Sequence, residues 1–448
     1  MLFSSIPFLY YFLPCVLILY HIVPKNCKNG ALLLASLVFY AWGEPRYVFL
    51  MITMILLNYA AGILIARYGR DKQGKAVFGG TILISVAVLS FFKFSNIAWP
   101  IGISFYTFQL ISYLADVYRG TAEAQKNPVS LGAYVTMFPQ LIAGPIVRYV
   151  DIDNQLRERT HDFEKTLQGI QRFTIGLGKK ILISNALGEL CEIFRASGEK
   201  SVLFFWIYAV SYTLQIYFDF SGYSDMAIGL GKIFGFDFLE NFNYPYISKS
   251  ITEFWRRWHM SLGTWFRDYV YIPLGGNRVS KSRWYFNIFV VWCLTGLWHG
   301  AAVQFVVWGL LFAVLLIIEK HWLLKRLEKG RFWNHVYVLF VVIISFVIFN
   351  AANMKEAVAY IGGMFGVGDL PLISKEAFYY LKSYGVLMTA AVVGSTPIVK
   401  NIMAKIERTA FGEKMMIFLR PVGLMCILAV CTAYLIDSSF NPFLYFRF

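Results

Sequence analysis

Long apolar segments alternate with short polar loops along the whole chain. Most of these segments approach the length that a helix needs to cross a hydrocarbon core about 30 Å thick. They span residues 5–23, 31–42, 46–66, 76–93, 97–117, 130–148, 201–219, 284–298, 301–319, 335–350, 383–398 and 419–436. The pattern therefore predicts an all-α polytopic membrane protein with about ten to twelve transmembrane helices.

Two long stretches fit neither a loop nor a simple span. Residues 149–185 mix charged and apolar positions at helical spacing, which is typical of a helix lying along the cytoplasmic face. Residues 222–283 hold short apolar runs interrupted by Gly, Pro, Asn, Arg and His. Such backbone is tolerated at membrane depth only where protein or a water-filled cavity surrounds it. The second stretch is therefore the first candidate for a functional site.

The composition fits the same class of protein. Of the 448 residues, 58% are hydrophobic and 15% are charged, which excludes a water-soluble globule. The net charge of +15 comes mainly from basic residues in short loops, so we expect no nucleic-acid partner. Basic loops follow the first, third and fifth segments, which predicts that both termini lie on the outer side. The six cysteines are scattered without a CxxC pair, and we expect small buried apolar side chains.

One histidine lies within a strongly apolar stretch. Four of the six histidines, His21, His161, His321 and His335, lie at segment ends or in charged loops, where an interfacial role is expected. His299 instead lies in LTGLWHGAAVQFVVWG, among small residues that allow close approach. A neutral imidazole accepts a proton near neutral pH, which is the task of a general base in acyl transfer. His299 is therefore a candidate catalytic residue.

The histidine at position 259 lies in the interrupted stretch, in ITEFWRRWHMSLGTWFRDYVYIPLGGNR. On one continuous helix it would share an apolar face with Trp255, Trp258, Leu262 and Phe266. Three neighbouring arginines need anionic or carbonyl partners, and these are Arg256, Arg257 and Arg267. The partners are either the carboxylates of Glu253 and Asp268 or the phosphates of a donor, and both readings stay open.

Other short motifs carry little chemistry. The PLGG turn before Asn277 and Arg278 predicts a structural reversal, although its backbone amides could also meet a phosphate. GLGKK at 176–180 and GLGKIFG at 229–235 lack the spacing of nucleotide-binding loops, and helix-packing glycines explain both. Two histidines forty residues apart, with no third ligand at a suitable spacing, predict no metal site. The absence of GxSxG gives no support for a serine nucleophile.

Five runs of the sequence, which follow one another in the family's order, resemble the membrane-bound O-acyltransferases. More narrowly, they resemble the bacterial branch of alginate and peptidoglycan O-acetylation proteins. The runs cover residues 102–120, 134–149, 215–236, 241–278 and 294–309. The other spans match only in hydropathy and length. The resemblance implies one integral-membrane acyltransferase domain over 1–448. N-terminal spans occupy 1–100, a catalytic core 101–310, and C-terminal spans with an outer-face tail 311–448.

The same resemblance implies a fold and a reaction. The fold is a ring of tilted helices, with short or re-entrant helices around a central tunnel. His299 matches the family's catalytic histidine in the WHG motif, and His259 matches its second polar residue of the active site. Arg256, Arg257, Arg267, Asn277 and Arg278 are candidates for binding the donor.

The implied donor is cytoplasmic acetyl-CoA, with no permanently bound cofactor. The implied recipient is a secreted or membrane-anchored partner acetyltransferase, which modifies a polysaccharide outside the bacterial cytoplasmic membrane. The polysaccharide is thus an indirect acceptor, and membrane lipids surround the chain. The D-alanyl branch typically lacks PLGGNR, so acetyl is favoured.

The C-terminal run FLYFRF suggests one further role. The phenol of Tyr445 could hold the acetyl group transiently, as in the similar tyrosine motif that ends the small partner of the D-alanyl system. The alternative is an aromatic anchor at the membrane interface, with Arg447 near the headgroups.

Two other functions remain compatible with the sequence. One is transfer of D-alanyl or a longer acyl group by the same fold. The other is a non-enzymatic transporter or polysaccharide export component, because such proteins also contain discontinuous helices and intramembrane arginines.

Overall fold

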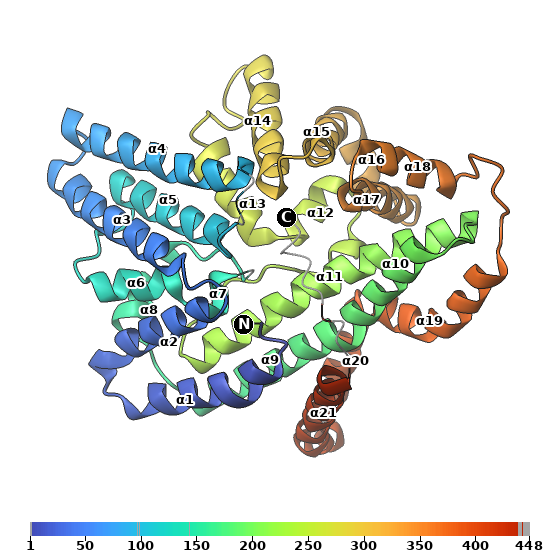
Figure 1. Ribbon diagram of the computed structural model, residues 1–448, viewed down its shortest axis with the longest axis horizontal. Coiled ribbons are helices and arrows are strands. Elements are labelled where there is room, and N and C mark those ends of the chain that lie inside the picture. Colours follow the sequence, from blue (N-terminus) through green and yellow to red (C-terminus); the bar gives the residue numbers. More distant parts are fainter. Residues whose placement is uncertain (1, 96, 98, 143, 438–440, 442–448) are drawn as a thin grey trace. The chain divides into compact units, whose positions relative to one another are not determined.

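The computed structural model describes residues 2–95, 97, 99–142, 144–437 and 441. These residues form helices joined by loops and contain no β-strand, which confirms the predicted all-α class (Figure 1). By contacts between residues they divide into two compact units. The assignment of 1–448 to a single acyltransferase domain stays a prediction.

Six helices of the described residues are long and apolar enough to cross a membrane. They are α3 (Val48–Tyr68), α4 (Lys72–Phe94), α11 (Val202–Ile233), the continuous stretch Val303–Lys329, α17 (Trp333–Asn350) and α21 (Ala410–Asp437). A seventh span results if α19 (Lys375–Gly394) and α20 (Ile398–Glu407), which meet at a bend of 67°, are taken together. The multi-pass architecture is therefore confirmed, while the total of ten to twelve stays a prediction.

The first unit comprises Met1–Phe173, Tyr223–Glu240 and Thr264–Val270. Besides α3 and α4 it holds η1 (Phe8–Phe12), α1 (Leu13–Ile22), η2 (Lys25–Cys27), α2 (Lys28–Gly43), α5 (Ile103–Arg119), α6 (Pro128–Thr136), α7 (Phe138–Leu141), α8 (Tyr149–Arg157) and most of α9 (Phe163–Gly178). Helix α5 is buried along nearly its whole length. It approaches α3 so closely that a Cβ at Gly62 would lie 2.5 Å from the Tyr113 hydroxyl.

The second unit comprises Thr174–Gly222, Asn241–Gly263 and Tyr271–Phe448. Its further elements are η3 (Lys179–Asn185), α10 (Ala186–Ala196), η4 (Pro245–Ile247), α12 (Ile251–Arg257), α13 (Met260–Phe266), η5 (Arg267–Tyr271), α14 (Lys281–His299), α15 (Val303–Ile318), η6 (Glu319–Leu323), α16 (Leu324–Lys329) and α18 (Met354–Met364). Helices α9, α11, α13 and η5 contribute residues to both units.

Helices α14 and α15 form a hairpin held at two glycines. A Cβ at Gly296 would lie 2.4 Å from the Phe305 carbonyl oxygen, and one at Gly309 would lie 2.3 Å from that of Trp292. Only glycine permits this separation, because real Cβ atoms do not approach backbone oxygens so closely. The hairpin thereby fixes the C-terminal end of α14, where His299 lies.

Several predicted boundaries were wrong. The span predicted over 130–148 breaks between α6 and α7 at Met137, just before Pro139 within α7, because the ring of proline restricts the backbone around it. The helix predicted along 149–185 breaks between α8 and α9. The span predicted over 201–219 continues to Ile233.

The two glycine motifs pack helices, as predicted. A Cβ at Gly229 would lie 2.6 Å from the Gly169 carbonyl oxygen, and one at Gly178 would lie 3.0 Å from Ile427.

The prediction of buried cysteines was wrong for three of them. Cys15, Cys27 and Cys426 have exposed side chains. Membrane helices turn apolar side chains outward toward lipid, so apolar character alone does not predict burial within the protein.

Candidate active site

His299 is the last residue of α14, and aromatic rings surround its imidazole. The ring centroid lies 4.6 Å from Trp298, 5.3 Å from Trp308 and 4.9 Å from Phe349. These rings come from α14, α15 and α17. His299 is 9% exposed, so its surroundings are largely apolar without sealing it completely.

The wall formed by Phe349 is held in place by hydrogen bonds at the end of α17. The buried side chain of Gln304, in α15, donates to the carbonyl oxygens of Ala351 (3.2 Å) and Ala352 (3.1 Å). Arg195 donates to the Asn350 carbonyl oxygen at 3.0 Å. Because these carbonyl groups lie in the last turn of α17 or just beyond it, no intrahelical donor would satisfy them.

His259 lies between two short helices rather than within one. Its φ is +47°, which places it in the left-handed region that side chains other than glycine rarely adopt. Helix α12 ends at Arg257 and α13 begins at Met260, so the prediction of one continuous helix through His259 was wrong. The backbone amide of Met260 donates to the Asn241 carbonyl oxygen (2.9 Å), and both the amide and hydroxyl of Ser261 donate to the Asn241 side chain. Asn241 thus takes donors that a continuous helix would satisfy internally.

The two predicted histidines lie close to one indole. The Trp298 centroid lies 6.1 Å from that of His259 and 4.6 Å from that of His299. His259 is only 5% exposed, and its Nδ1 makes no hydrogen bond to another described residue. Two buried imidazoles next to one aromatic side chain can supply a proton acceptor and a second polar contact to a substrate.

A buried carboxylate holds the N-terminal end of the short helix α12. Glu319, fully buried at the end of α15, accepts hydrogen bonds from the amide of Ile251 (2.6 Å), the amide of Thr252 (2.9 Å) and the hydroxyl of Thr252 (2.7 Å). It therefore caps α12, the helix that leads into His259. In the same helix, Trp255 packs against Trp292 of α14 at 4.8 Å.

Sequence reasoning missed Glu319, Gln304 and Asn241. Glu319 lies at the end of an apolar segment, where an acidic residue indicates only a segment boundary. A signal was present for Gln304, because it is a polar residue inside the apolar stretch that follows His299.

The five predicted donor-binding residues have different surroundings. Arg257 pairs with Glu253 at 2.9 Å, and Arg267 pairs with Asp268 at 2.7 Å. Internal ion pairing, one of the two predicted alternatives, is therefore present for these two arginines. Arg256, Asn277 and Arg278 are exposed and make no side-chain hydrogen bond or ion pair with other described residues. Arg267 belongs to the first unit and the other four residues to the second.

The PLGG segment forms the predicted reversal. Gly275 and Gly276 have φ of +105° and +57°. Their amides donate to the carbonyl oxygens of Ile272 and Tyr271, and the Arg278 amide donates to Gly275. These amides are thus used within the turn.

Two further predictions concern Tyr445 and a metal site. Tyr445 lies outside the described residues. Within the described part of the chain, no cluster of three or more His, Cys, Asp or Glu side chains is arranged to hold a metal.

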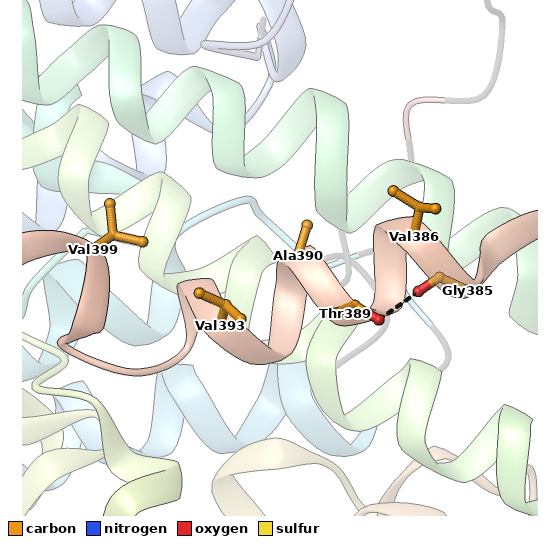
Figure 2. A pocket seen from close by; sticks show the side chains of 6 residues that line it. All are labelled: Gly385, Val386, Thr389, Ala390, Val393 and Val399. Atoms are coloured by element: carbon orange, nitrogen blue, oxygen red, sulfur yellow. Dashed lines mark hydrogen bonds between the residues drawn. The ribbon is translucent and has the colours of Figure 1, made fainter. Parts of the chain in front are cut away.

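An open apolar groove of about 590 Å³ lies elsewhere in the second unit (Figure 2). It is lined by Gly385, Val386, Thr389, Ala390, Val393 and Val399. Its one hydroxyl, on Thr389, donates to the Gly385 carbonyl oxygen of the same helix at 2.8 Å. The groove therefore offers no group for proton or acyl transfer.

Comparison with known proteins gives matches that span the histidine site. The family model of the membrane-bound O-acyltransferases matches residues 125–355, which include both His259 and His299. A protein described as a probable alginate O-acetylase of Azotobacter vinelandii is 37% identical over the full length of both chains. A peptidoglycan O-acetyltransferase of Helicobacter pylori is 30% identical over all of this chain and 98% of its own. A teichoic acid D-alanyltransferase of Bacillus subtilis is 32% identical over 62% of this chain and 77% of its own.

Proposed function

The chain belongs to the membrane-bound O-acyltransferase family, and from this premise we propose that it transfers acetyl from cytoplasmic acetyl-CoA across the membrane. The acetyl group then serves the O-acetylation of an extracytoplasmic polysaccharide, such as an alginate-, peptidoglycan- or cellulose-like polymer. A partner acetyltransferase outside or anchored in the cytoplasmic membrane completes that step. The names of the alginate and peptidoglycan relatives support acetyl as the group and a polysaccharide as the final acceptor.

The observation that carries the proposal is the pair of buried imidazoles next to Trp298. His299 is the proposed general base. It removes the proton of the acceptor hydroxyl while the acceptor oxygen forms a bond to the acetyl carbonyl carbon. The carbon–sulfur bond of the thioester then breaks, and the proton passes from His299 to the leaving thiolate. His259, whose Nδ1 bonds to no other described residue, is the proposed hydrogen-bonding partner of the reacting carbonyl group.

The proposed donor site uses polar residues that flank His259 in the sequence. Arg256, Asn277 and Arg278 are exposed and have polar groups available for the phosphates of acetyl-CoA. Arg257 and Arg267 belong to the same proposal, although their carboxylate partners reduce their capacity to bind a second anion.

The phenol of Tyr445 remains a proposed transient acetyl carrier. Mass spectrometry of the C-terminal peptide after exposure to donor tests it, and normal turnover in Tyr445→Phe would contradict it.

The relationship to a D-alanyltransferase supports a second candidate, the same reaction with a D-alanyl thioester. Membrane vesicles that contain the protein can be given either acetyl-CoA or a D-alanyl carrier thioester, and release of the free thiol can be followed. We expect thiol release from acetyl-CoA with the wild type and with His21→Ala, and strongly reduced release with His299→Ala. His21 is a matched control because it is exposed and, among the described residues, its side chain hydrogen-bonds only within its own helix. Release from the D-alanyl thioester alone would favour the second candidate, and release from neither would contradict both.

A further inference from the structure

A cluster of hydrogen-bond donors lies in the first unit, around the hydroxyl of Tyr20 near the end of α1. Arg159 Nε lies 2.8 Å from this hydroxyl and His161 Nε2 lies 2.9 Å from it. Lys28 Nζ lies 3.4 Å from the same His161 nitrogen and 4.6 Å from the centroid of the Tyr20 ring. We call Tyr20, Lys28, Arg159 and His161 the Tyr20 cluster.

The cluster contains more donors than acceptors. The Tyr20 hydroxyl donates its only hydrogen to the Phe234 carbonyl oxygen at 2.7 Å, so its oxygen accepts from both Arg159 and His161. His161 Nε2 therefore carries a hydrogen and offers no lone pair to the Lys28 ammonium group. Arg159 Nη1 donates to the Asn29 side chain at 2.6 Å, but its Nη2 is buried and has no acceptor among the described residues. Buried donors without an acceptor are costly and point to a missing partner.

The positive charge of the cluster is not compensated by neighbouring acids. Within the described residues, neither Lys28 nor Arg159 nor His161 forms an ion pair. Among the nearby acids, Glu158 and Asp162 form no ion pair with the cluster within the described residues, and Asp237 pairs with Lys165. Partial burial, together with the charges of Lys28 and Arg159, lowers the pKa of His161 to about 4. Burial and the charge of Arg159 also lower the pKa of Lys28.

A glycine keeps the cluster compact. Gly235, at a φ of +87°, lies against the cluster, and a Cβ there would be 3.1 Å from the Thr160 carbonyl oxygen and 3.3 Å from His161 Nε2. The guanidinium of Arg159 also lies 4.6 Å from the centroid of Phe236. The donors are thus held by surrounding backbone and rings rather than extended freely into solvent.

The cluster lies at one end of an apolar exposed helix. In α1, Ile18 is 60% exposed and Ile22 is 76% exposed, as expected of side chains that face lipid. The polar end of such a helix lies at the depth of the lipid headgroups, where lysine and arginine meet phosphate.

We propose that the Tyr20 cluster binds an anionic phosphate group through Lys28 and Arg159. A phosphate supplies the acceptors that Arg159 Nη2 and the Lys28 ammonium group lack, and its charge offsets theirs. The phosphate belongs either to an anionic phospholipid or to a soluble phosphorylated molecule. This site is separate in the chain from the proposed donor-binding arginines and does not rest on acyl transfer.

The test measures thermal unfolding of the purified full chain in detergent with three probes. These are inorganic phosphate against chloride at equal ionic strength, adenosine 3′,5′-bisphosphate, and phosphatidylglycerol against phosphatidylcholine. We expect at least one probe to raise the Tm of the wild type, and the most effective probe identifies the source. Lys28→Gln should need about tenfold more of that probe for the same rise in Tm, because one charged contact is lost.

The control variant is Lys75→Gln, which removes an exposed lysine from the same unit and should respond to the probe like the wild type. Arg159→Gln is less suitable alone, because Arg159 also holds Tyr20 and Asn29. Native mass spectrometry of retained phospholipid in the wild type and Lys28→Gln gives a second measurement that does not depend on unfolding. An equal response of Lys28→Gln and wild type, or no response of the wild type to any probe, would overturn the proposal.

Discussion

His259 occupies a backbone conformation that disfavours almost every residue except glycine. Its φ of +47° costs about 1–2 kcal/mol relative to the right-handed region. Glycine does not carry this cost. Strain at a buried histidine whose Nδ1 makes no hydrogen bond to another described residue is typical of functional positions.

A pair of substitutions separates this strain from the loss of the ring. His259→Ala and His259→Gly both remove the imidazole, but only alanine keeps the strained backbone. We expect His259→Gly to be more stable than His259→Ala by about 1 kcal/mol, measured by thermal or denaturant unfolding. At Leu262, within α13, the order should reverse because glycine disfavours helix. The same order at both positions would contradict the strain at His259.

The sequence allowed prediction of some site residues and not of others. His299 could be singled out because an ionisable side chain in a long apolar stretch is rare and costly. The conformation of His259 could not, because Asn241, distant in the chain, accepts the hydrogen bonds that break the helix. Likewise, residue type alone could not decide whether Arg257 and Arg267 pair with nearby carboxylates, which depends on how the backbone orients them.

At the scale of elements, the short helix α12 depends on an acid outside it. Glu319 accepts three hydrogen bonds from Ile251 and Thr252, at the N-terminus of α12. Glu319→Ala leaves buried donors unsatisfied and should lower the free energy of unfolding by about 3 kcal/mol. Acyl transfer should fall as well, because α12 leads into His259. Glu328→Ala, at an exposed acid of α16, is the control and should change neither quantity. Unchanged stability in Glu319→Ala would contradict this role.

The hairpin of α14 and α15 gives a second prediction at this scale. Gly296→Ala would place a methyl group 2.4 Å from the Phe305 carbonyl oxygen, so the helices must move apart and displace His299. We expect a loss of about 2 kcal/mol in stability and a fall in acyl transfer. Gly80→Ala in α4 meets open space and should be neutral or stabilising by up to about 1 kcal/mol. Equal unfolding temperatures of the two variants would show that the hairpin is not tightly packed at Gly296.

Helices were predicted most accurately where long apolar composition alone determines them. The span predicted over 46–66 corresponds closely to α3, and that over 335–350 corresponds to α17. The span predicted over 130–148 failed because a proline restricts the backbone within an otherwise apolar run. The polar second half of α11 is helical as well, and it packs closely on Gly169 at Gly229, a tertiary contact that composition does not reveal.

At the scale of the whole molecule, the distribution of basic loops predicts the orientation in the membrane. Lys75, in the basic segment near the start of α4, is expected on the cytoplasmic side, and Arg46, in the less charged turn before α3, on the outer side. In a cysteine-free background, an impermeant maleimide should label Arg46→Cys in intact cells but Lys75→Cys only in inverted vesicles. The opposite labelling would reverse the predicted orientation.

We expect one buried imidazole, that of His299, to carry the acyl transfer that modifies an exported polysaccharide. The most direct test is the O-acetyl content of envelope polysaccharide, measured as acetate released by mild base. Cells without the protein are compared with cells that produce the wild type, His299→Ala or the matched control His21→Ala. Wild type and His21→Ala should restore acetylation, whereas His299→Ala, present in the membrane in equal amount, should give about 10²–10⁴-fold less. Full acetylation with His299→Ala would contradict the account.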